Sequence, residues 1–252
     1  MRRLIRLCLL SSMLLVFTLP FLQAQPVTIT QFRYVADEDR EEFLHRETTY
    51  WSEIARAAIK EGKMVGWELW ERVGGWNLSE GSNFIFVNQF SKVEDLNNLR
   101  AIWNPTKVFP KGRMANMETE SMSTLNHQLI FQGNSYAGTG EEPNFIRVNY
   151  SKASDLSKYL ELERTMWQPF IKKQIDEKNT SQVSWFSAVK IMPAGVDLPF
   201  NAVSVDGYKT MSEAVLPASS FKTEPTFPDM KAINEVHKKM RIQVYRKVKI
   251  VR

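Results

Sequence analysis

Cysteine and histidine are scarce in this sequence. Among its 252 residues there is one cysteine, Cys8, and there are three histidines. A single cysteine excludes an internal disulfide, and it also excludes a zinc site built from several thiolates. The fold therefore depends on an apolar core, and 43% apolar residues against 24% charged ones are sufficient for a globular protein.

The usual signatures of catalytic and phosphate-binding loops are missing as well. No Gly-x-Ser-x-Gly, Gly-x-Gly-x-x-Gly or Gly-Lys-Ser/Thr segment occurs, so the sequence indicates neither a serine-nucleophile turn nor a phosphate loop. Glu42 and His45 have the spacing of a di-iron ligand pair, but a second such pair is absent. We therefore expect no metal site and no cofactor.

Long apolar runs are confined to the N-terminus. Three arginines precede an apolar run from Leu7 to Leu22, which is followed by the small residue Ala24. This order is typical of a secretory signal peptide. The alternative is an uncleaved membrane anchor, but this run is shorter than the roughly 20 residues that span a bilayer. We predict that residues 1–24 are a signal peptide and that the protein is exported to the periplasm or the extracellular space.

Loss of the signal peptide changes the charge and the thiol content. The formal charge falls from +5 to +2, because three arginines and no acidic residue leave, and Cys8 leaves too. Export without cysteine is more typical of bacterial envelope proteins than of small disulfide-rich domains. A net charge near neutral argues against a nucleic-acid partner. We also expect no transmembrane segment in the mature chain.

The mature sequence resembles one unit used twice. Three short matches recur in the same order: residues 47–51 with 163–167, 65–67 with 183–185, and 84–87 with 200–203. In the first match a Glu, a Thr and a Trp recur at an offset of 116 residues. A repeat of this length indicates a duplicated structural unit. We place the two units at residues 25–140 and 141–252.

Both units have the same predicted order of elements. In the first, strands are expected at 27–35, 64–73, 83–90 and 127–131, with helices at 37–62, 92–103 and 112–125. In the second, strands are expected at 144–150, 182–192, 200–205 and 242–251, with helices at 155–177, 208–215 and 229–240. We expect Pro169 to kink the long helix. Strand–helix–strand–strand–helix–strand is the ferredoxin-like order.

Two such units in one chain resemble the dimeric α+β-barrel superfamily. That superfamily includes antibiotic-biosynthesis-monooxygenase-like, chlorite-dismutase-like and NIPSNAP-like proteins. The resemblance covers residues 27–252 and rests on element order and duplication, not on a motif. It implies an α+β fold in which two antiparallel ferredoxin-like sheets enclose a pseudo-dimeric barrel with helices outside. It transfers no catalytic residue, and the three histidines do not recur at matching positions of the two units.

Glu47 and Glu163 are the candidate catalytic residues. Each lies on the apolar face of its predicted helix, four residues before a Trp on that face. Burial raises the pKa of a carboxyl group, which suits a general acid or base. The alternative is structural: each carboxylate accepts a hydrogen bond from a hydroxyl or an indole, or pairs with Arg33 or Arg147. A repeated residue is more often a shared packing solution than a pair of active sites.

Tryptophans and a few polar residues form the candidate ligand site. Trp67 and Trp185 match between the units and are interpreted as core. Trp70 lies on the opposite side of its predicted strand, together with Glu68 and Arg72. That side is expected to face a cavity, where an aromatic ring and polar groups hold a ligand. Trp76 is the fourth candidate, and core packing is the alternative for both unmatched tryptophans.

The C-terminal segment is basic, with seven Lys or Arg residues from position 238 to 252 and no acid. A membrane surface or a polyanion is one conceivable partner. We favour an edge strand whose charges discourage pairing with other chains.

These observations favour an exported barrel protein that binds a small, largely apolar or aromatic ligand. The pseudo-dimer is expected to be a monomer or part of a higher oligomer. One alternative is a cofactor-independent oxygenase or isomerase that uses Glu47 or Glu163 as a base. Another is an envelope protein that acts through its surface and holds no ligand. A shared fold does not decide between them.

Export can be tested directly. When the full chain is expressed in a bacterium, we expect the protein from the envelope fraction to start at Gln25, because the segment before it has the order of a cleaved leader. Intact-mass measurement and N-terminal sequencing check this. A protein that keeps residues 1–24 in the membrane fraction would favour the anchor instead.

Overall fold

The computed structural model describes residues 26–73, 81–110, 116–195 and 198–252. The predicted signal peptide and Trp76 lie outside these ranges. Eight strands occur within them: β1 (Val27–Val35), β2 (Gly66–Arg72), β3 (Phe84–Phe90), β4 (Ser123–Gly138), β5 (Phe145–Ala153), β6 (Ser184–Met192), β7 (Ala202–Tyr208) and β8 (His237–Val251).

Helices connect and cover these strands. The α-helices are α2 (Arg40–Arg46), α3 (Ser52–Lys60), α4 (Leu99–Ile102), α5 (Leu156–Leu162), α6 (Gln168–Asp176), α7 (Met211–Val215) and α8 (Lys231–Val236). Two π-helical turns, Glu47–Trp51 and Glu163–Trp167, join α2 to α3 and α5 to α6, and 3-10 turns cover Val93–Asn98, Pro105–Lys107 and Pro217–Ser220. No helix in the described ranges has both the length and the apolar character needed to cross a membrane.

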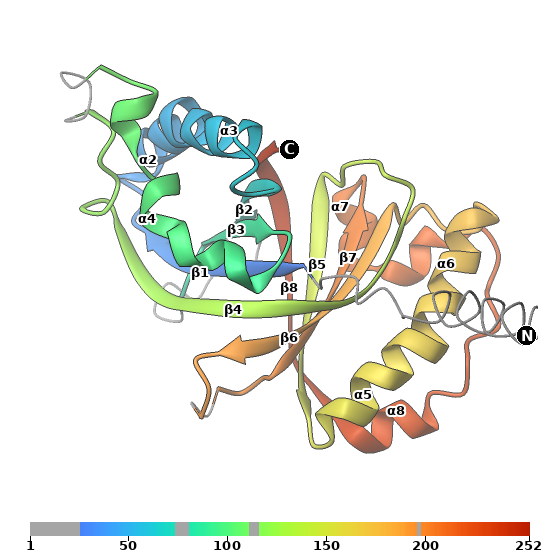
Figure 1. Cartoon of the computed structure of the whole chain (residues 1–252). Helices are drawn as coiled ribbons and strands as arrows, with labels where there is room; N and C mark the ends of the chain where they lie inside the picture. The colour runs from blue at the N-terminus through green and yellow to red at the C-terminus, as the bar shows by residue number, and fades with distance from the viewer. Residues whose placement is uncertain (1–25, 74–80, 111–115, 196–197) are drawn as a thin grey trace, which may run out of the picture.

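The eight strands form one closed antiparallel barrel in the order β1-β3-β2-β8-β5-β7-β6-β4. Each unit contributes a three-stranded sheet, β1-β3-β2 or β5-β7-β6. The long strands β4 and β8 join these two sheets. β4 pairs with β1 of its own unit and with β6 of the other, and β8 pairs with β5 and β2 in the same way. Figure 1 shows β4 crossing from one unit to the other. The α+β barrel with tandem ferredoxin-like units is confirmed.

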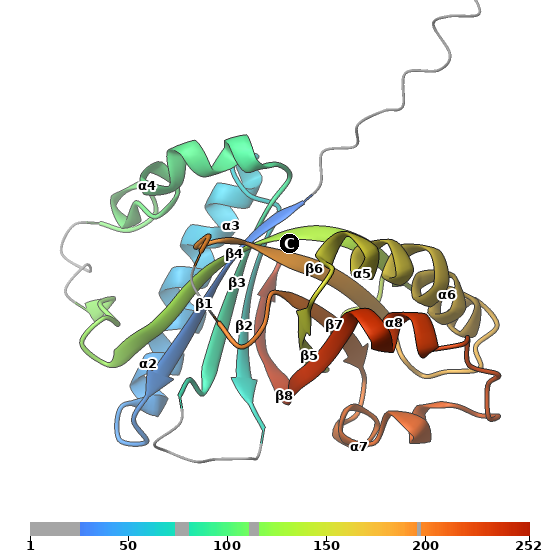
Figure 2. The same ribbon diagram turned by 90° about the horizontal axis from the view of Figure 1, so that it is seen from below.

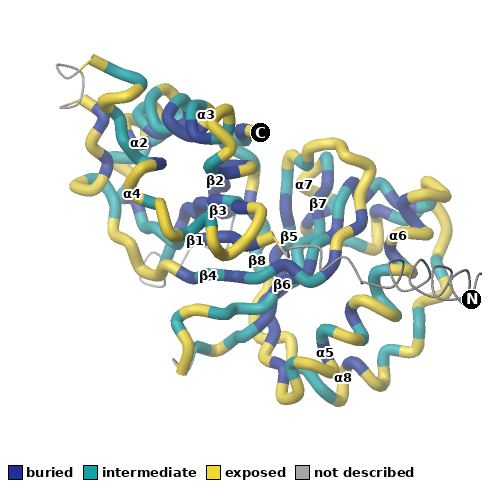
Figure 3. The backbone as a smooth tube through the Cα atoms, in the orientation of Figure 1, coloured by how far each residue is buried: buried dark blue, intermediate teal, exposed yellow. Residues whose placement is uncertain are grey.

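The helices lie outside the barrel in two groups. Figure 2 shows α2, α3 and α4 on one side of the strands and α5, α6 and α8 on the other. Each group packs on its own sheet, so that one apolar cluster around Phe43, Trp67 and Phe86 lies under the first group. A separate cluster, which includes Trp70 and Phe131, fills part of the barrel interior. Buried segments therefore follow the strands and the inner faces of the helices (Figure 3).

The duplication holds in detail, but one of the three sequence matches is out of register. Thr30 pairs with Val87 in the first unit, and Val148 pairs with Val205 in the second. Equivalent residues of these strands are therefore 118 positions apart in the sequence. Val87 therefore corresponds to Val205, not to Val203. Phe200 precedes β7 and has no counterpart in Phe84.

A repeated asparagine marks the correct register. Asn83 donates to the Val35 carbonyl at 2.7 Å and accepts from the Val35 amide at 2.9 Å. Asn201, 118 residues later, makes the same two bonds with Ala153, at 2.9 and 2.8 Å. In both units a side-chain amide thus takes the place of a neighbouring strand and completes the hydrogen bonds at the end of β1 or β5.

Several predicted helices are wrong. Residues 116–122 form turns and Ser123 already belongs to β4, so the helix expected at 112–125 is absent from the part that is described. The helix expected at 229–240 ends at Val236, and Tyr208 is in β7 rather than in a helix. At β4 and β8 the strand pairing of the barrel overrides a weak local helix pattern, because both long strands must reach the opposite unit.

Two further expectations change. The basic C-terminal segment does not end a sheet as a single edge strand: β8 joins two sheets, and it pairs with β5 over His237–Arg246 and with β2 over Tyr245–Val251. The irregularity in the second long helix precedes Pro169 and is a π-helical turn. The first unit has the same turn, although Glu53 stands where the second unit has proline, so proline does not cause it.

The asparagine clamp gives a stability prediction. We expect Asn83→Ala to lower the free energy of unfolding by about 1–3 kcal/mol, because it leaves the buried amide and carbonyl of Val35 without partners. Urea denaturation measures this. The control is Asn126→Ala, since that exposed side chain bonds only to Ser82; an equal loss in both variants would contradict the clamp.

Candidate functional site

Strand alternation in β2 decides which side chains enter the barrel. Trp67 and Leu69 belong to the apolar cluster under the first group of helices. Glu68 and Trp70 point the other way and line a cavity inside the barrel. Successive strand residues face opposite sides of a sheet, so the alternation read from the sequence placed Glu68 and Trp70 correctly.

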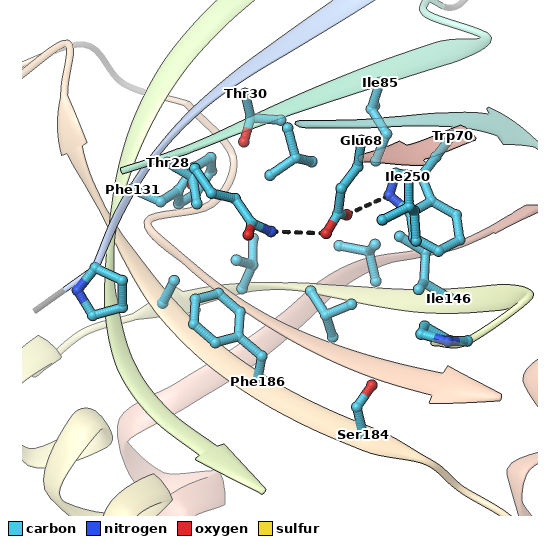
Figure 4. A pocket seen from close by; sticks show the side chains of 18 of the residues that line it. Thr28, Thr30, Glu68, Trp70, Ile85, Phe131, Ile146, Ser184, Phe186 and Ile250 are labelled. Atoms are coloured by element: carbon cyan, nitrogen blue, oxygen red, sulfur yellow. Dashed lines mark hydrogen bonds between the residues drawn. The ribbon is translucent and has the colours of Figure 1, made fainter. Parts of the chain in front are cut away.

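The barrel contains a cavity of about 470 Å³. Its wall is largely apolar and draws on all eight strands. Figure 4 shows its lining from close by. The apolar and aromatic lining residues include Phe32, Ile85, Val87, Phe131, Ile146, Val148, Phe186, Ala188, Val203, Val205 and Ile250. A space of this size lies within the range of pockets that bind small molecules.

One corner of the cavity is polar and is organised around Glu68. Its Oε2 accepts a hydrogen bond from the Trp70 indole at 2.6 Å (Figure 4). Its Oε1 accepts from Gln89 at 2.7 Å and from the Arg252 guanidinium at 2.5 Å. Glu68 itself is buried. The three donors occupy three of the roughly four acceptor sites of the carboxylate, and the ion pair with Arg252 offsets its charge.

Gly66 makes room for this corner. A Cβ atom at Gly66 would lie 2.6 Å from Arg252 Nη1 and 2.7 Å from Gln89 Oε1. Both distances are shorter than non-bonded contact allows, so any larger residue there would push the two side chains away from Glu68. The glycine thus belongs to the site although it makes no polar side-chain contact.

Most of the polar corner belongs to the first unit, which supplies Glu68, Trp70 and Gln89, whereas Arg252 comes from the second unit. In the second unit the positions that correspond to Glu68, Trp70 and Gln89 are Phe186, Ala188 and Gly207, which have the same strand partners. These are apolar or small, and Phe186 and Ala188 line the cavity. At these positions the second unit therefore supplies apolar or small residues where the first unit supplies hydrogen-bonding groups.

Comparisons by sequence gave no match, either to a protein-family model or to a curated protein. Solved structures do match. A candidate monooxygenase from Lactobacillus acidophilus NCFM is 13% identical, with a TM-score of 0.55 over 90% of this chain and 96% of its own. A second, from Fusobacterium nucleatum, is 10% identical with a TM-score of 0.55 over 90% and 94%. An anthrone oxidase-like protein is 10% identical with a TM-score of 0.51 over 90% and 92%.

These structures have the ferredoxin-like α+β-barrel fold. The chain has the dimeric α+β-barrel fold. At this level of identity the likeness concerns the fold alone. Because the similarity spans nine-tenths of the chain, both units of this α+β barrel take part in it.

The structure places the predicted ligand-site residues in different parts of the α+β barrel. Glu68 and Trp70 line the cavity together. Arg72 is buried and lies further along β2, near Tyr150 and Tyr245, and does not line this cavity. Trp76 lies outside the described residues. Gln89 and Arg252 were missed; the strand pattern could have indicated Gln89, whereas the position of Arg252 follows from the exchange of β8.

Glu47 lies between helix and sheet, outside the barrel cavity. Its side chain is buried and accepts a hydrogen bond from the Thr119 hydroxyl at 2.8 Å. Burial raises the pKa of Glu47 to about 7, against the smaller opposing effects of Thr119 and Arg33. Glu47 therefore has a hydroxyl partner, as the structural alternative predicted.

Glu163 holds the equivalent place in the second unit, also away from the barrel cavity. Burial raises its pKa to about 7, while the neighbouring Tyr159 hydroxyl lowers it and Asp206 raises it further. Its Oε2 atom is buried and makes no hydrogen bond with any described residue. Glu163 is thus less fully satisfied than Glu47, although neither carboxylate forms a salt bridge among the described residues.

The raised pKa of Glu47 predicts how stability depends on pH. A carboxyl group with a folded-state pKa near 7 and an unfolded pKa near 4.5 destabilises the fold as the pH rises between those values. We expect Glu47→Gln to match the wild type near pH 5 and to exceed its free energy of unfolding by up to about 3 kcal/mol at pH 8.5.

Urea denaturation across this pH range measures the difference. The control is Glu118→Gln, because hydrogen bonds from Ser121 lower the pKa of that exposed carboxyl group. That variant should be no more stable than the wild type at any pH between 5 and 8.5. A Glu47→Gln curve parallel to the wild type would show that Glu47 has an ordinary pKa.

Proposed function

We propose that the barrel binds a small, largely apolar molecule that offers one hydrogen-bonding group to the Glu68 corner. The observation that carries this proposal is the cavity of about 470 Å³ with apolar walls and one polar corner. Binding sites for small molecules commonly combine apolar lining with a few polar groups that fix orientation.

The charge of the corner favours a neutral ligand. The Glu68 carboxylate is paired with Arg252, so an additional ionic group on the ligand would be left without a partner in a largely apolar space. A ligand N–H or O–H can donate to a remaining lone pair of Glu68. The opposite wall, with Phe186 and Ala188, accepts an apolar body.

A second candidate function is proton-transfer catalysis at Glu163, as in a cofactor-independent oxygenase or isomerase. It is favoured by one observation: the buried Oε2 atom of Glu163 has no hydrogen-bond partner among the described residues, and its carboxyl pKa is about 7. Glu163 does not line the barrel cavity. An activity that survives blockage of the cavity and is lost in Glu163→Gln would support this candidate.

We also propose that binding takes place outside the cytoplasm. The support is the predicted signal peptide at residues 1–24 and the absence of cysteine after it. A ligand that co-purifies with the protein from its envelope fraction, identified by native mass spectrometry, would support both parts of the proposal.

Filling the cavity tests the binding proposal. Val205 lines the cavity on β7 and is only partly buried, so its side chain has free space before it. We expect Val205→Phe to weaken the binding of N-phenyl-1-naphthylamine about tenfold or more, because the larger ring occupies the space of this neutral, apolar probe. The fluorescence of the probe in an apolar site measures its binding.

The control is Val215→Phe, which adds the same ring on the exposed surface of α7. This variant should bind the probe as the wild type does. If the wild type gives no saturable signal, or if both variants bind with unchanged affinity while folded by circular dichroism, the cavity is not a binding site.

A further inference from the structure

The barrel has a second cavity at its other end. It has a volume of about 840 Å³ and opens where β1 ends and where β4 and β8 begin. Phe32 and Tyr150 line both cavities and stand between them. The other described lining residues are Tyr34, Gly81, Ser82, Thr124, Asn126, His127, Leu198, Pro199, Phe200, Met240, Arg241, Gln243 and Tyr245.

Aromatic rings form the inner wall of this second cavity. The ring of Tyr150 lies 4.8 Å from that of Phe200 and 6.5 Å from that of Phe32. Phe32 in turn lies 6.4 Å from His127, edge to face. Such a wall offers a planar apolar ligand both face and edge contacts.

The charge at this end is of one sign. Arg241 and His127 line the cavity, and none of its described lining residues is acidic. Arg241 forms no ion pair with any acidic residue in the described ranges. The first cavity differs, because Glu68, Glu141 and Glu142 lie around it. An anion is therefore favoured at the second cavity and disfavoured at the first.

The repeat places the two basic residues at corresponding positions. His127 pairs with Phe32 across β4 and β1, and Arg241 pairs with Tyr150 across β8 and β5. Since Phe32 and Tyr150 correspond between the units, both barrel seams present a nitrogen donor beside an aromatic ring at this end.

Polar neighbours hold Arg241 without neutralising it. The Gln243 amide lies 2.6 Å from the Tyr245 hydroxyl and, with its nitrogen directed there, accepts from Arg241 at 2.5 and 3.1 Å. The hydroxyls of Tyr150 and Tyr245 lie 3.2 Å apart. Burial raises the pKa of both tyrosines, so both remain protonated and able to donate. The guanidinium is thus oriented by neutral groups, and no described carboxylate pairs with it.

We propose that the second cavity binds a small aromatic carboxylate, with the carboxylate on Arg241 and the ring against Phe32 and Phe200. A planar guanidinium matches a carboxylate in a two-point hydrogen bond. The site is separate from the Glu68 corner, and the inference does not depend on what occupies the first cavity.

The test uses 1-naphthoate and its neutral amide, 1-naphthamide, titrated by calorimetry into the full-length protein after signal removal. We expect 1-naphthoate to bind at least about tenfold more tightly than the amide, and Arg241→Gln to remove most of that difference. Arg241→Lys, which keeps the charge but loses the planar fork, should retain part of it.

The matched control is Lys239→Gln, which removes a charge from the same strand at a residue that does not line the cavity. It should bind 1-naphthoate as the wild type does, and so should Val205→Phe. Equal affinity for acid and amide, equal losses in Arg241→Gln and Lys239→Gln, or no binding at all would overturn the inference. Loss in Val205→Phe alone would assign the acid to the first cavity and overturn it as well.

Discussion

The exchange of β4 and β8 between the two units is the constraint on which the rest of the structure depends. A three-stranded sheet such as β1-β3-β2 has two open edges, and unpaired edges invite association with other chains. Here each long strand pairs with its own unit and with the other, so that both sheets lose their edges at once. The halves therefore share one barrel, and neither unit encloses a cavity alone. β8 makes this connection by pairing with β5 along its first part and with β2 along its last part.

Because the barrel is closed, alternate side chains of each strand enter two separate environments: the barrel interior and the layer beneath the helices. Side chains such as Glu68 enter the barrel, whereas Trp67 packs beneath the helices. A residue moved by one position along β2 would change from one environment to the other. The asparagines at 83 and 201 help to fix this register, because each clamps the end of the strand that pairs next to it. The polar corner depends on the same register, since Gln89 and Arg252 come from β3 and β8 and reach Glu68 only if both strands pair as they do.

The sequence was sufficient for the fold class and for part of the site. The repeated Glu and Trp at an offset of 116 revealed the duplication, and strand alternation in β2 set Glu68 and Trp70 on the inner side. Local patterns failed where pairing between units decides the structure. The start of β4 carries polar residues that suit a helix, and His237–Met240 follows a helix without a break, yet both segments are strands. The contribution of Arg252 could not be predicted either, because it lies 184 residues from Glu68 in the sequence.

The units have also diverged in where they bury polar groups. In the first unit the polar residues face the barrel, and the layer between sheet and helices is apolar, with Phe43 and Phe90 in its core. The second unit has Tyr159 and Tyr208 at those two positions, with Asp206 near both. The first unit thus has hydrocarbon rings where the second unit buries two phenol groups. The repeated glutamates differ in the same way: Glu47 has the Thr119 hydroxyl and the Arg33 guanidinium near it, whereas Glu163 has the Tyr159 hydroxyl and the Asp206 carboxyl group. Because Asp206 raises the pKa of Glu163 and Arg33 lowers that of Glu47, the same position in the two units has opposite electrostatic neighbours.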